Sequence, residues 1–321
     1  MNRTPLTLLS TTLLVTLALT GCGSGASKDP AASGGGGEAG GRASTATING
    51  FEVSTDPEAA AMLPEQYAKE IRIVTSAPYP PFEVFDADQK LVGLDIDLGD
   101  MIAAKLSTTT TWESIDYNGI IPALQAAKYD MVLASIGDTP EREKALDFVN
   151  YSKQGQVLLV PAGNPENIKG LQSMCGKTLA VEAGNVTEGY FAEIDTECKR
   201  QGAKPMTVRE LPKTSDALLA VKSGGAEAQY IGVATAADLE TTEEGAGYDI
   251  ITPADKPFGY LPRYVGVGLP KGSTGLRDAV QAALESLLAD GTIAKLYAKY
   301  GQEQILIDKI VRNTVKDEPL L

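Results

Sequence analysis

The chain has 321 residues and no histidine, with 28 Lys and Arg against 42 Asp and Glu and a formal net charge of −14 at pH 7. This acidic balance argues against nucleic acid as a partner and against a polybasic hold on anionic lipid. The missing histidine excludes Ser-His and Cys-His nucleophile schemes and leaves too few ligands for a metal site. We therefore expect neither a metal nor a cofactor.

The N-terminus has the features of a secretory signal over residues 1–21. One charge, Arg3, precedes an apolar run over residues 6–19, which is too short to span a bilayer comfortably. The run stops at the sequence LTGC, which ends on Cys22 and resembles the lipobox of bacterial lipoproteins. We therefore expect cleavage before Cys22 and diacylation of its thiol, and each buried CH₂ would add about 0.8 kcal/mol of membrane affinity. The alternative is an ordinary signal peptide with a stray cysteine.

A tether is expected after the signal. Residues 23–46 are almost all Gly, Ser and Ala, cannot bury a core, and predict a flexible segment. Its reach is about 25–30 Å, at roughly 5–6 Å × √n. Residues 22–66 are assigned to the lipidated cysteine, this tether and a lead-in. Without Arg3 the mature chain has 27 basic and 42 acidic side chains, and no second apolar stretch is long enough to cross a membrane.

Short apolar runs alternate with helical patterns from residue 71 onward. Strands are predicted over 71–76, 129–136, 177–184 and 264–272. Helices are predicted over 95–106, 216–224 and 275–301, the last as one or two helices. The first of them places Ile96, Met101, Ile102 and Leu106 on one face. This alternation favours parallel α/β sheets, in one large domain or two of ordinary size.

A further helix is expected after Thr139, a good N-cap, with Pro140 as its first residue. Arg142 would then lie in the first turn, where a cation opposes the helix dipole by roughly 0.3–1 kcal/mol. One interpretation is a solvated arginine paired with Glu141 or Asp138. The other is that Arg142 and the free N–H groups of the helix start bind an anion. The local sequence leaves both open.

Two cysteines, Cys175 and Cys198, remain in the part expected to be exported. In an exported protein a lone pair is most simply a disulfide that closes one loop. The loop would hold about 22 residues and contribute roughly 3 kcal/mol to the free energy of unfolding.

Three blocks of the sequence resemble the bacterial extracellular solute-binding proteins of family 3, the polar-amino-acid receptors of ABC importers. They are YPPFEVFDADQKLVGLDIDLGDMIAAKL (79–106), GIIPALQAAKYDMVLASIGDTPEREKALDFVNY (119–151) and LLADGTIAKLYAKYG (287–301). The blocks follow the family's order, and the resemblance covers about residues 67–313.

The resemblance implies an α/β, two-lobed fold of the type II periplasmic-binding-protein kind, with a central ligand cleft and two crossing hinge strands. Lobe 1 would comprise residues 67–153 and 264–313, and lobe 2 residues 157–259. Both Cys175 and Cys198 would then fall in lobe 2. Ligand capture would be a hinge motion in which contacts from both lobes favour the closed state.

The family also implies a carboxylate clamp at Arg142. The arginine of its T-x-x-R block holds the ligand's α-carboxylate, and Arg142 stands at that position in this chain. A planar, permanently charged guanidinium suits a carboxylate in a dry cleft. Ser135, Gly137 and Thr139 would present backbone groups and hydroxyls beside it.

Two aromatic residues match pocket positions of the family. Tyr79 corresponds to the aromatic that packs against the ligand's side chain, with a simple turn aromatic as the alternative. Tyr117 falls at another pocket-lining position, and core packing is the alternative there.

Lobe 2 departs from the family pattern in two places. The loop that closes over the carboxylate has Asn185 and Val186 where the family favours Gly-Thr-Thr or Gly-Ser-Thr, so only the backbone N–H of Val186 could serve there. The family's aspartate that pairs with the ligand's α-ammonium falls on Gly232. An ammonium in a closed cleft needs compensation, which puts a standard α-amino-acid site in doubt.

Glu182 is the candidate that could compensate for the missing aspartate, if its side chain faces the cleft. The alternative is a solvated glutamate at a strand end. Together, Arg142 and Glu182 would suit a zwitterion. This ligand would be an amino acid, or a betaine- or ectoine-like compound whose cation is not a primary amine.

The resemblance implies a monomeric, lipid-anchored receptor on the extracytoplasmic face of the cell membrane. It would deliver its ligand to the permease and ATPase subunits of an ABC importer. A second hypothesis is a sensory lipoprotein that presents its ligand to a membrane kinase. A third is an enzyme, because dehydratases acting on prephenate-like acids share the fold and need a poised carboxylic acid. Glu182 is the one candidate acid, and no second catalytic group accompanies it, so we expect no enzyme.

Overall fold

The computed structural model describes residues 44–185, 188–252 and 258–316. All of them belong to one compact unit. The expected signal peptide, the lipidation site Cys22, most of the tether and Val186 lie outside the described residues. Among the helices of the described part, none has the length and apolarity that a membrane span needs.

A β-hairpin opens the described chain, with strands β1 (Thr45–Ile48) and β2 (Phe51–Ser54). Its turn residues Asn49 and Gly50 have φ angles of 47° and 89°, which an Asn-Gly pair accommodates readily. Helix α1 (Pro57–Met62) follows. The expected end of the tether is therefore wrong, because the first two residues of β1 were assigned to it. The signal for the hairpin was the Asn-Gly pair between its two strands.

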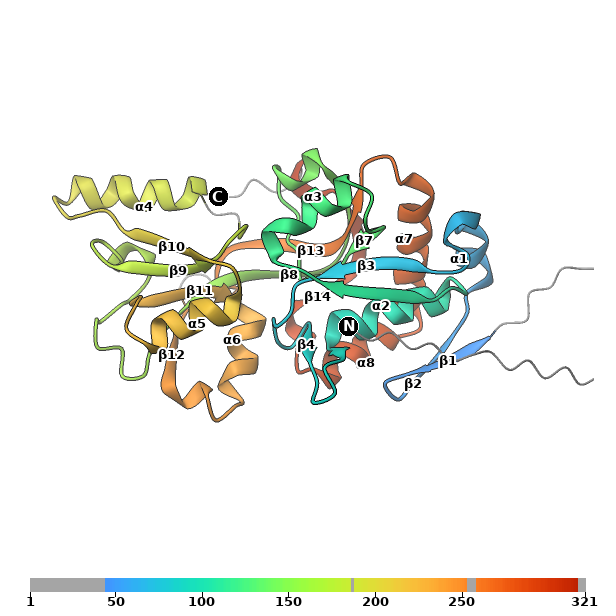
Figure 1. The fold of residues 1–321 in the computed structure, drawn as a ribbon, viewed down its shortest axis with the longest axis horizontal. Helices are drawn as coiled ribbons and strands as arrows, with labels where there is room; N and C mark the ends of the chain where they lie inside the picture. Colours follow the sequence, from blue (N-terminus) through green and yellow to red (C-terminus); the bar gives the residue numbers. More distant parts are fainter. Residues whose placement is uncertain (1–43, 186–187, 253–257, 317–321) are drawn as a thin grey trace, which may run out of the picture. The chain divides into compact units, whose positions relative to one another are not determined.

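One ten-stranded sheet organises the rest of the chain, in the order β10-β9-β11-β8-β13-β7-β3-β6, with β12 and β14 also paired to β8 (Figure 1). Its strands are β3 (Ile71–Thr75), β6 (Thr110–Ser114), β7 (Met131–Val132), β8 (Leu146–Pro161), β9 (Thr178–Glu182), β10 (Thr207–Leu211), β11 (Ala228–Gly232), β12 (Tyr248–Ile251), β13 (Tyr260–Pro270) and β14 (Leu306–Arg312). A separate ribbon pairs β4 (Val84–Phe85) with β5 (Leu91–Val92). Strands β3, β6 and β7 are parallel, as are β9, β10 and β11. The expected parallel pairing is therefore found within each lobe, whereas the long strands β8 and β13 run antiparallel to each other and make the whole sheet mixed.

Helices cover both faces of this sheet. They are α2 (Leu94–Lys105), α3 (Ile120–Gln125), α4 (Glu188–Arg200), α5 (Thr214–Lys222), α6 (Val233–Glu240), α7 (Thr274–Ala289) and α8 (Thr292–Lys299). The expected face of α2 is confirmed, because all four of its predicted apolar residues are buried. The long pattern over 275–301 forms two helices that separate at Gly291, which has a φ of 75°.

The helix expected after Thr139 is not formed. Arg142–Lys144 make only a 3₁₀ turn, and the buried strand β8 already begins at Leu146. Thr139 does cap this turn, because its Oγ1 accepts a hydrogen bond from the N–H of Arg142 at 3.2 Å. The N–H of Glu143 donates to the carbonyl oxygen of Thr139 at 2.8 Å. These N–H groups are therefore used within the chain, so the free N–H groups of a helix start are not present, and binding of an anion by Arg142 itself stays a prediction.

The two-lobed fold is confirmed by separate hydrophobic cores on either side of the long strands. In lobe 1, Ile73 of β3 packs with α2, α7 and α8, whereas its neighbour Val74 packs on the other face with α3. In lobe 2, Leu179 of β9 packs with α4, whereas Ala180 packs with α5 and α6. Side chains that alternate across a strand thus give each lobe a sheet with helices on both faces.

Strands β8 and β13 connect the lobes. β8 pairs with β13 from Leu146 to Gln156, and its last residues pair with β11 and β12 of lobe 2. The expected lobe boundary at 153–157 lies inside β8, and the one at 259–264 lies at the start of β13. The two strands run through these positions, and the boundaries themselves stay a prediction.

Cys175 and Cys198 form a disulfide, with their Cα atoms 5.5 Å apart. Cys198 lies on α4 and is fully buried in a core of lobe 2. The pair expected from the sequence is therefore present, and it joins two parts of one lobe.

Candidate ligand-binding site

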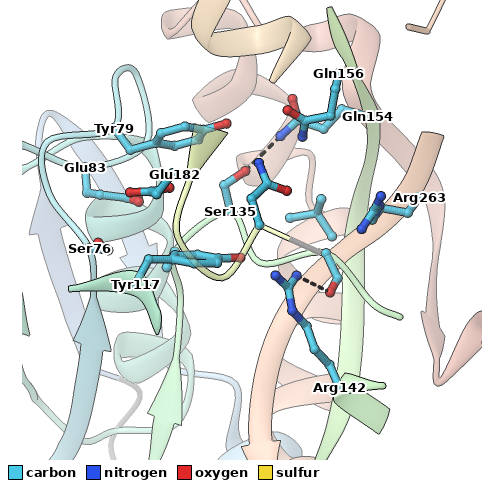
Figure 2. A pocket seen from close by; sticks show the side chains of 14 residues that line it. Ser76, Tyr79, Glu83, Tyr117, Ser135, Arg142, Gln154, Gln156, Glu182 and Arg263 are labelled. Carbon is cyan, nitrogen blue, oxygen red and sulfur yellow. Dashed lines mark hydrogen bonds between the residues drawn. The ribbon is translucent and has the colours of Figure 1, made fainter. Parts of the chain in front are cut away.

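A pocket lies where the crossing strands meet both lobes (Figure 2). Lobe 1, the crossing strands and lobe 2 all supply side chains to it. The lining residues are Ser76, Tyr79, Glu83, Tyr117, Ala134, Ser135, Gly137 and Arg142 from lobe 1, Gln154, Gln156, Arg263 and Val265 from the crossing strands, and Glu182 and Asn185 from lobe 2.

Arg142 is buried in this pocket, with 4% of its surface exposed. Its Nη1 donates to the carbonyl oxygen of Gly137 at 2.8 Å, and its Nη2 donates to that of Gly184 at 3.0 Å. The guanidinium also lies over the ring of Tyr117, with Cζ 5.4 Å from the ring centroid. Gly137 belongs to lobe 1 and Gly184 to lobe 2, so this one side chain links the lobes. A solvated arginine paired with Glu141 does not fit this burial, and Glu141 pairs with Lys144 instead.

A guanidinium has five N–H donors, of which these two bonds use one each from Nη1 and Nη2. The planar fork therefore keeps the capacity to bind a carboxylate beside its backbone partners. The guanidinium of Arg142 is thus a cation at the cavity that backbone carbonyl groups of both lobes hold in place.

The loop that carries Arg142 is held from behind by the buried side chain of Asp138. Its Oδ2 accepts hydrogen bonds from Nδ2 of Asn150 at 2.9 Å, and from the N–H and Oγ1 of Thr314 at 2.8 and 3.0 Å. Thr314 lies after β14, beyond the last of the three blocks that resemble the family. The C-terminal segment thus positions the loop from which the clamp projects.

Ser135 is positioned by an equally buried carboxylate, Asp95, at the start of α2. Asp95 accepts from the N–H of Ser135 at 2.7 Å and from the hydroxyl of Tyr151 at 2.9 Å. Burial raises the pKa of Asp95 to about 6. Nε2 of Gln154 donates to Oγ of Ser135 at 2.8 Å, and the N–H of Ala234 in lobe 2 donates to Oε1 of Gln154 at 3.3 Å. A chain of hydrogen bonds therefore runs from α2 through the pocket to lobe 2.

The remaining residues predicted beside Arg142 divide into two groups. Gly137 lines the pocket, as does Asn185 on lobe 2. Thr139 is 1% exposed and does not line it; its Oγ1 caps the turn instead. The role of Thr139 in ligand binding therefore stays a prediction, and Thr139 does not line the pocket.

Two buried carboxyl groups line the pocket, those of Glu83 and Glu182 (Figure 2). Glu83 is 1% exposed and Glu182 is 9% exposed. Glu182 Oε1 accepts a hydrogen bond from the N–H of Thr214 at 3.2 Å, whereas Oε2 of Glu83 has no hydrogen-bond partner among the described residues. Glu182 thus faces the cleft, which is the orientation that the expected role needs and that a solvated strand-end glutamate would lack.

Both carboxyl groups are shifted towards their neutral form. Burial raises the pKa of Glu182 to about 7, although the bonds from Thr214 and the charge of Arg142 act in the opposite direction. Burial also raises the pKa of Glu83 well above its usual range, and the carboxyls of Asp95 and Glu182 add to this effect. A cation placed between Glu83 and Glu182 would reverse the shift, because it favours the charged carboxylate.

The position of the missing family aspartate is filled from the other lobe. A Cβ atom added to Gly232 would lie 2.4 Å from the hydroxyl oxygen of Tyr79. Tyr79 stacks on Phe82 with ring centroids 5.9 Å apart, and its N–H donates to the carbonyl oxygen of Glu83 at 2.7 Å. The hydroxyl of Tyr79 therefore occupies the space into which a side chain at position 232 would project.

Sequence reasoning missed half of the lining residues, and Glu83, Gln154, Gln156 and Arg263 are the larger polar ones among them. Glu83 follows PPF inside the first block, so its place beside Tyr79 was a usable signal. The other three lie on β8 and β13, and Arg263 stands in register with Gln154. No local pattern marks which face of a crossing strand meets the ligand. Within the described residues, no group of three or more acidic or cysteine side chains could hold a metal ion.

Several known proteins are similar to this chain in sequence and in structure. The L-arginine-binding protein of Pseudomonas aeruginosa is 27% identical over 238 residues, which cover 72% of this chain and 88% of that protein. An ancestral arginine-binding protein, solved with arginine bound, is 34% identical, with a TM-score of 0.64, and the match covers 72% of this chain and 97% of that one. An ancestral amino-acid-binding protein, a precursor of cyclohexadienyl dehydratase, is 28% identical, with a TM-score of 0.63 and a coverage of 73% and 96%.

The similar proteins named above are binding proteins, and they match this chain over both lobes. The family model for bacterial extracellular solute-binding proteins, family 3, matches residues 71–303. That range begins at β3 and extends through α8, so it includes every residue that lines the pocket. The chain belongs to the bacterial extracellular solute-binding proteins of family 3.

Proposed function

We propose that this protein is the receptor of an ABC importer and captures a small carboxylate-bearing zwitterion by closure of its two lobes. The observation that carries the proposal is Arg142, a buried permanent cation that bonds to backbone carbonyls of both lobes at the pocket. A carboxylate bound by this guanidinium would contact lobe 1 and reach the loop of lobe 2 that holds Gly184. Contacts from both lobes favour the closed state, which is how a ligand shifts a hinge equilibrium.

The opposite charge of the ligand would lie at Glu182. This carboxyl is the buried acidic group that lobe 2 supplies to the pocket. Arg142 and Glu182 line the same pocket from different lobes, which suits a ligand with one anionic and one cationic end. An amino acid is the first choice, because the related binding proteins named above bind arginine or another amino acid. A betaine- or ectoine-like ligand is the alternative, since the usual aspartate is replaced by Gly232.

The sequence supports a place for this receptor at the membrane. The lipobox-like LTGC and the Gly/Ser/Ala-rich residues after it would anchor a monomer by lipid at Cys22, on the extracytoplasmic face, next to the permease and ATPase subunits. Mass analysis of the exported protein tests this point, because diacylation at Cys22 adds the mass of the lipid to the mature N-terminal peptide.

A thermal-shift screen tests the binding function. The mature protein is heated with about twenty separate compounds, which include the polar L-amino acids, betaines and simple carboxylates. A ligand at 100 times its dissociation constant adds about 2.7 kcal/mol to the free energy of unfolding, which is easily measured. Recovery of the compound unchanged after incubation separates a receptor from an enzyme. A screen in which no carboxylate-bearing zwitterion stabilises the protein contradicts the proposal.

A further inference from the structure

Arg263 brings a second guanidinium into the pocket that already holds Arg142 (Figure 2). It lies on β13, one of the two crossing strands, and stands in register with Gln154 of the other. Arg142 reaches the cavity from the loop before β8. Two cations from separate parts of the chain thus line one cavity, which a ligand with a single carboxylate does not need.

The two arginines meet at Gly137. A Cβ atom added to Gly137 would lie 2.5 Å from Cδ of Arg263 and 3.6 Å from Nη1 of Arg142. A side chain at position 137 would therefore clash with Arg263 as it is placed, whereas Arg142 would remain at an ordinary contact distance. This close approach explains why glycine stands at a position where the φ angle does not require it.

The charges of the pocket are unequal at neutral pH. A guanidinium stays protonated in proteins, so Arg142 and Arg263 count as two positive charges. Of the two carboxyl groups across from them, burial raises the pKa of Glu182 to about 7 and that of Glu83 well above its usual range. The charge of Arg142 and burial in turn lower the pKa of Arg263, burial being the larger cause. Among the described residues that line the pocket, two guanidinium groups thus accompany two carboxyl groups that are shifted towards their neutral form.

We propose that Arg142 and Arg263 bind two carboxylates of the same ligand, while the cationic group of that ligand lies at Glu182 and Glu83. The chemical class is a small amino dicarboxylate, with one ammonium or substituted ammonium group and two carboxylates. This inference rests on the proposed receptor function and makes its ligand more specific. Arg142 holds the carboxylate common to all amino acids, and Arg263 selects for the second one.

Two pairs of near-isosteric amino acids test the second carboxylate directly. L-glutamate and L-glutamine, and L-aspartate and L-asparagine, differ only by a carboxylate in place of an amide. Isothermal titration calorimetry of the mature protein at pH 7.5 is expected to give an affinity at least tenfold higher for the dicarboxylate member of one pair. Arg263→Gln is expected to remove this preference, and Arg263→Lys, which keeps the charge, to keep part of it.

Lys153→Gln is the matched control. Lys153 lies on β8, opposite Tyr264 and next to the Arg263 register, and its Nζ is 4.9 Å from the centroid of the Tyr264 ring. The substitution Lys153→Gln removes one positive charge from the same pair of strands, and Lys153 is not one of the residues that line the pocket. The control should leave the ratio of the two affinities within a factor of about two of the wild type.

The outcomes separate this inference from the receptor function on which it rests. Wild-type protein that binds neither dicarboxylate more tightly than its amide overturns the inference, and so does an Arg263→Gln variant that lowers both affinities equally. Two other results would contradict the receptor function itself. The first is that Arg142→Ala binds zwitterions as well as the wild type does, and the second is that no screened compound binds at all. Thermal unfolding of each variant confirms that the comparison is made on folded protein.

Discussion

The two lobes contribute to the pocket in very different ways. Lobe 1 supplies eight of the fourteen lining residues and the crossing strands four, whereas lobe 2 supplies Glu182 and Asn185. The lobe 1 loops are also held by buried carboxylates, Asp95 behind Ser135 and Asp138 behind Arg142. Lobe 1 thus carries a preformed half of the site, because its polar groups are oriented by fixed partners before any ligand arrives.

Lobe 2 has fewer contacts, but these contacts decide when the site is complete. The carbonyl oxygen of Gly184 accepts a hydrogen bond from Arg142, and the carboxyl of Glu182 helps to raise the pKa of Glu83. Lobe 2 also lacks the family's aspartate, since Tyr79 from lobe 1 fills the space beside Gly232. Under the proposed function, lobe 1 would bind the carboxylate end of the ligand, and lobe 2 would add Glu182 to the site for the cationic end.

The largest effect is expected from the clamp of lobe 1. Arg142→Ala should abolish measurable binding while leaving the fold intact, because a desolvated charge pair is worth on the order of 2–5 kcal/mol. Calorimetry with the best ligand of the screen provides the measurement. Lys144→Ala, two residues further along the same turn and exposed, is the control and should bind normally. Unchanged affinity of Arg142→Ala would remove lobe 1 as the carboxylate-binding half.

Loss of the disulfide should affect the stability of lobe 2 rather than the site. The Cys175–Cys198 bond spans 23 positions, and a loop of this length is worth roughly 3 kcal/mol in the chain-entropy estimate. Reduction, or paired Cys→Ser substitution, should lower the free energy of unfolding by about this amount in thermal or denaturant unfolding. Affinity should change little, because neither cysteine lines the pocket. A collapse of affinity would show that the stiffness of lobe 2 contributes to the site.

The choice made by lobe 2 is tested with Glu182→Gln. A zwitterion should lose on the order of 2–3 kcal/mol of binding free energy, whereas a simple carboxylate should keep its affinity. Calorimetry with one ligand of each kind compares the two. Equal losses for both ligands would mean that Glu182 acts on the shape of the pocket. No loss for the zwitterion would place its cation at backbone carbonyls or on the faces of Tyr79 and Tyr117.

The pH dependence follows from the same residue. In the free protein, burial raises the pKa of Glu182 to about 7 from an ordinary 4.5. The folded state therefore holds this proton more tightly than the unfolded state, and the free energy of unfolding should fall as pH rises from about 4.5 to 7. A bound cation favours the ionised form, so affinity for a zwitterion should rise between pH 6 and 8, with proton release. Glu182→Gln should flatten both profiles in unfolding and calorimetric titrations, and an unchanged slope would contradict the assignment.

A smaller effect is expected at the close approach between Gly232 of lobe 2 and Tyr79 of lobe 1. Gly232→Asp alone should weaken binding, because its Cβ would lie 2.4 Å from Oη of Tyr79 and overpacking costs typically 1–3 kcal/mol. With Tyr79→Phe added, the nearest ring atom is Cζ at 3.6 Å, an ordinary contact. The double variant should then shift preference towards ordinary L-α-amino acids, unless the new carboxylate is repelled by Glu182. Tyr79→Phe alone is the control, and a double variant no better than Gly232→Asp would contradict the steric explanation.

The smallest effect concerns the support of the clamp loop. Thr314→Val removes one of the hydrogen bonds to Asp138 but keeps the backbone one, which should cost about 0.5–1.5 kcal/mol of stability. Affinity should fall with it, because the Arg142 loop loses a fixed point. Thr241→Val in lobe 2, whose Oγ1 bonds only to a carbonyl of its own helix end, is the control. Thermal unfolding and calorimetry together show whether lobe 1 is preformed by this segment.

Much of the fold was predictable because its signals are local. The apolar face of α2, the strands at Ile71 and Thr178 and the two helices after residue 274 follow from periodicity within a few residues. Errors arose where a local signal was overruled. Thr139 caps a turn, but the chain enters the buried strand β8 before a helix can form. The mixed sheet could not be predicted from strand-helix alternation, because the antiparallel pairing of β8 and β13 joins segments about a hundred residues apart.

By itself, the sequence determined the family, the pairing of two cysteines and the candidate clamp Arg142, because each depends on residue types at short spacing. Only the tertiary structure decided that Arg263 and Gln154 enter the pocket, since a strand turns alternate residues to opposite faces and its register depends on distant partners. It also decided that Tyr79 occupies the space at Gly232 and that Glu83 and Glu182 line the same pocket. These contacts bring together residues from both lobes, and no local pattern encodes how two lobes meet.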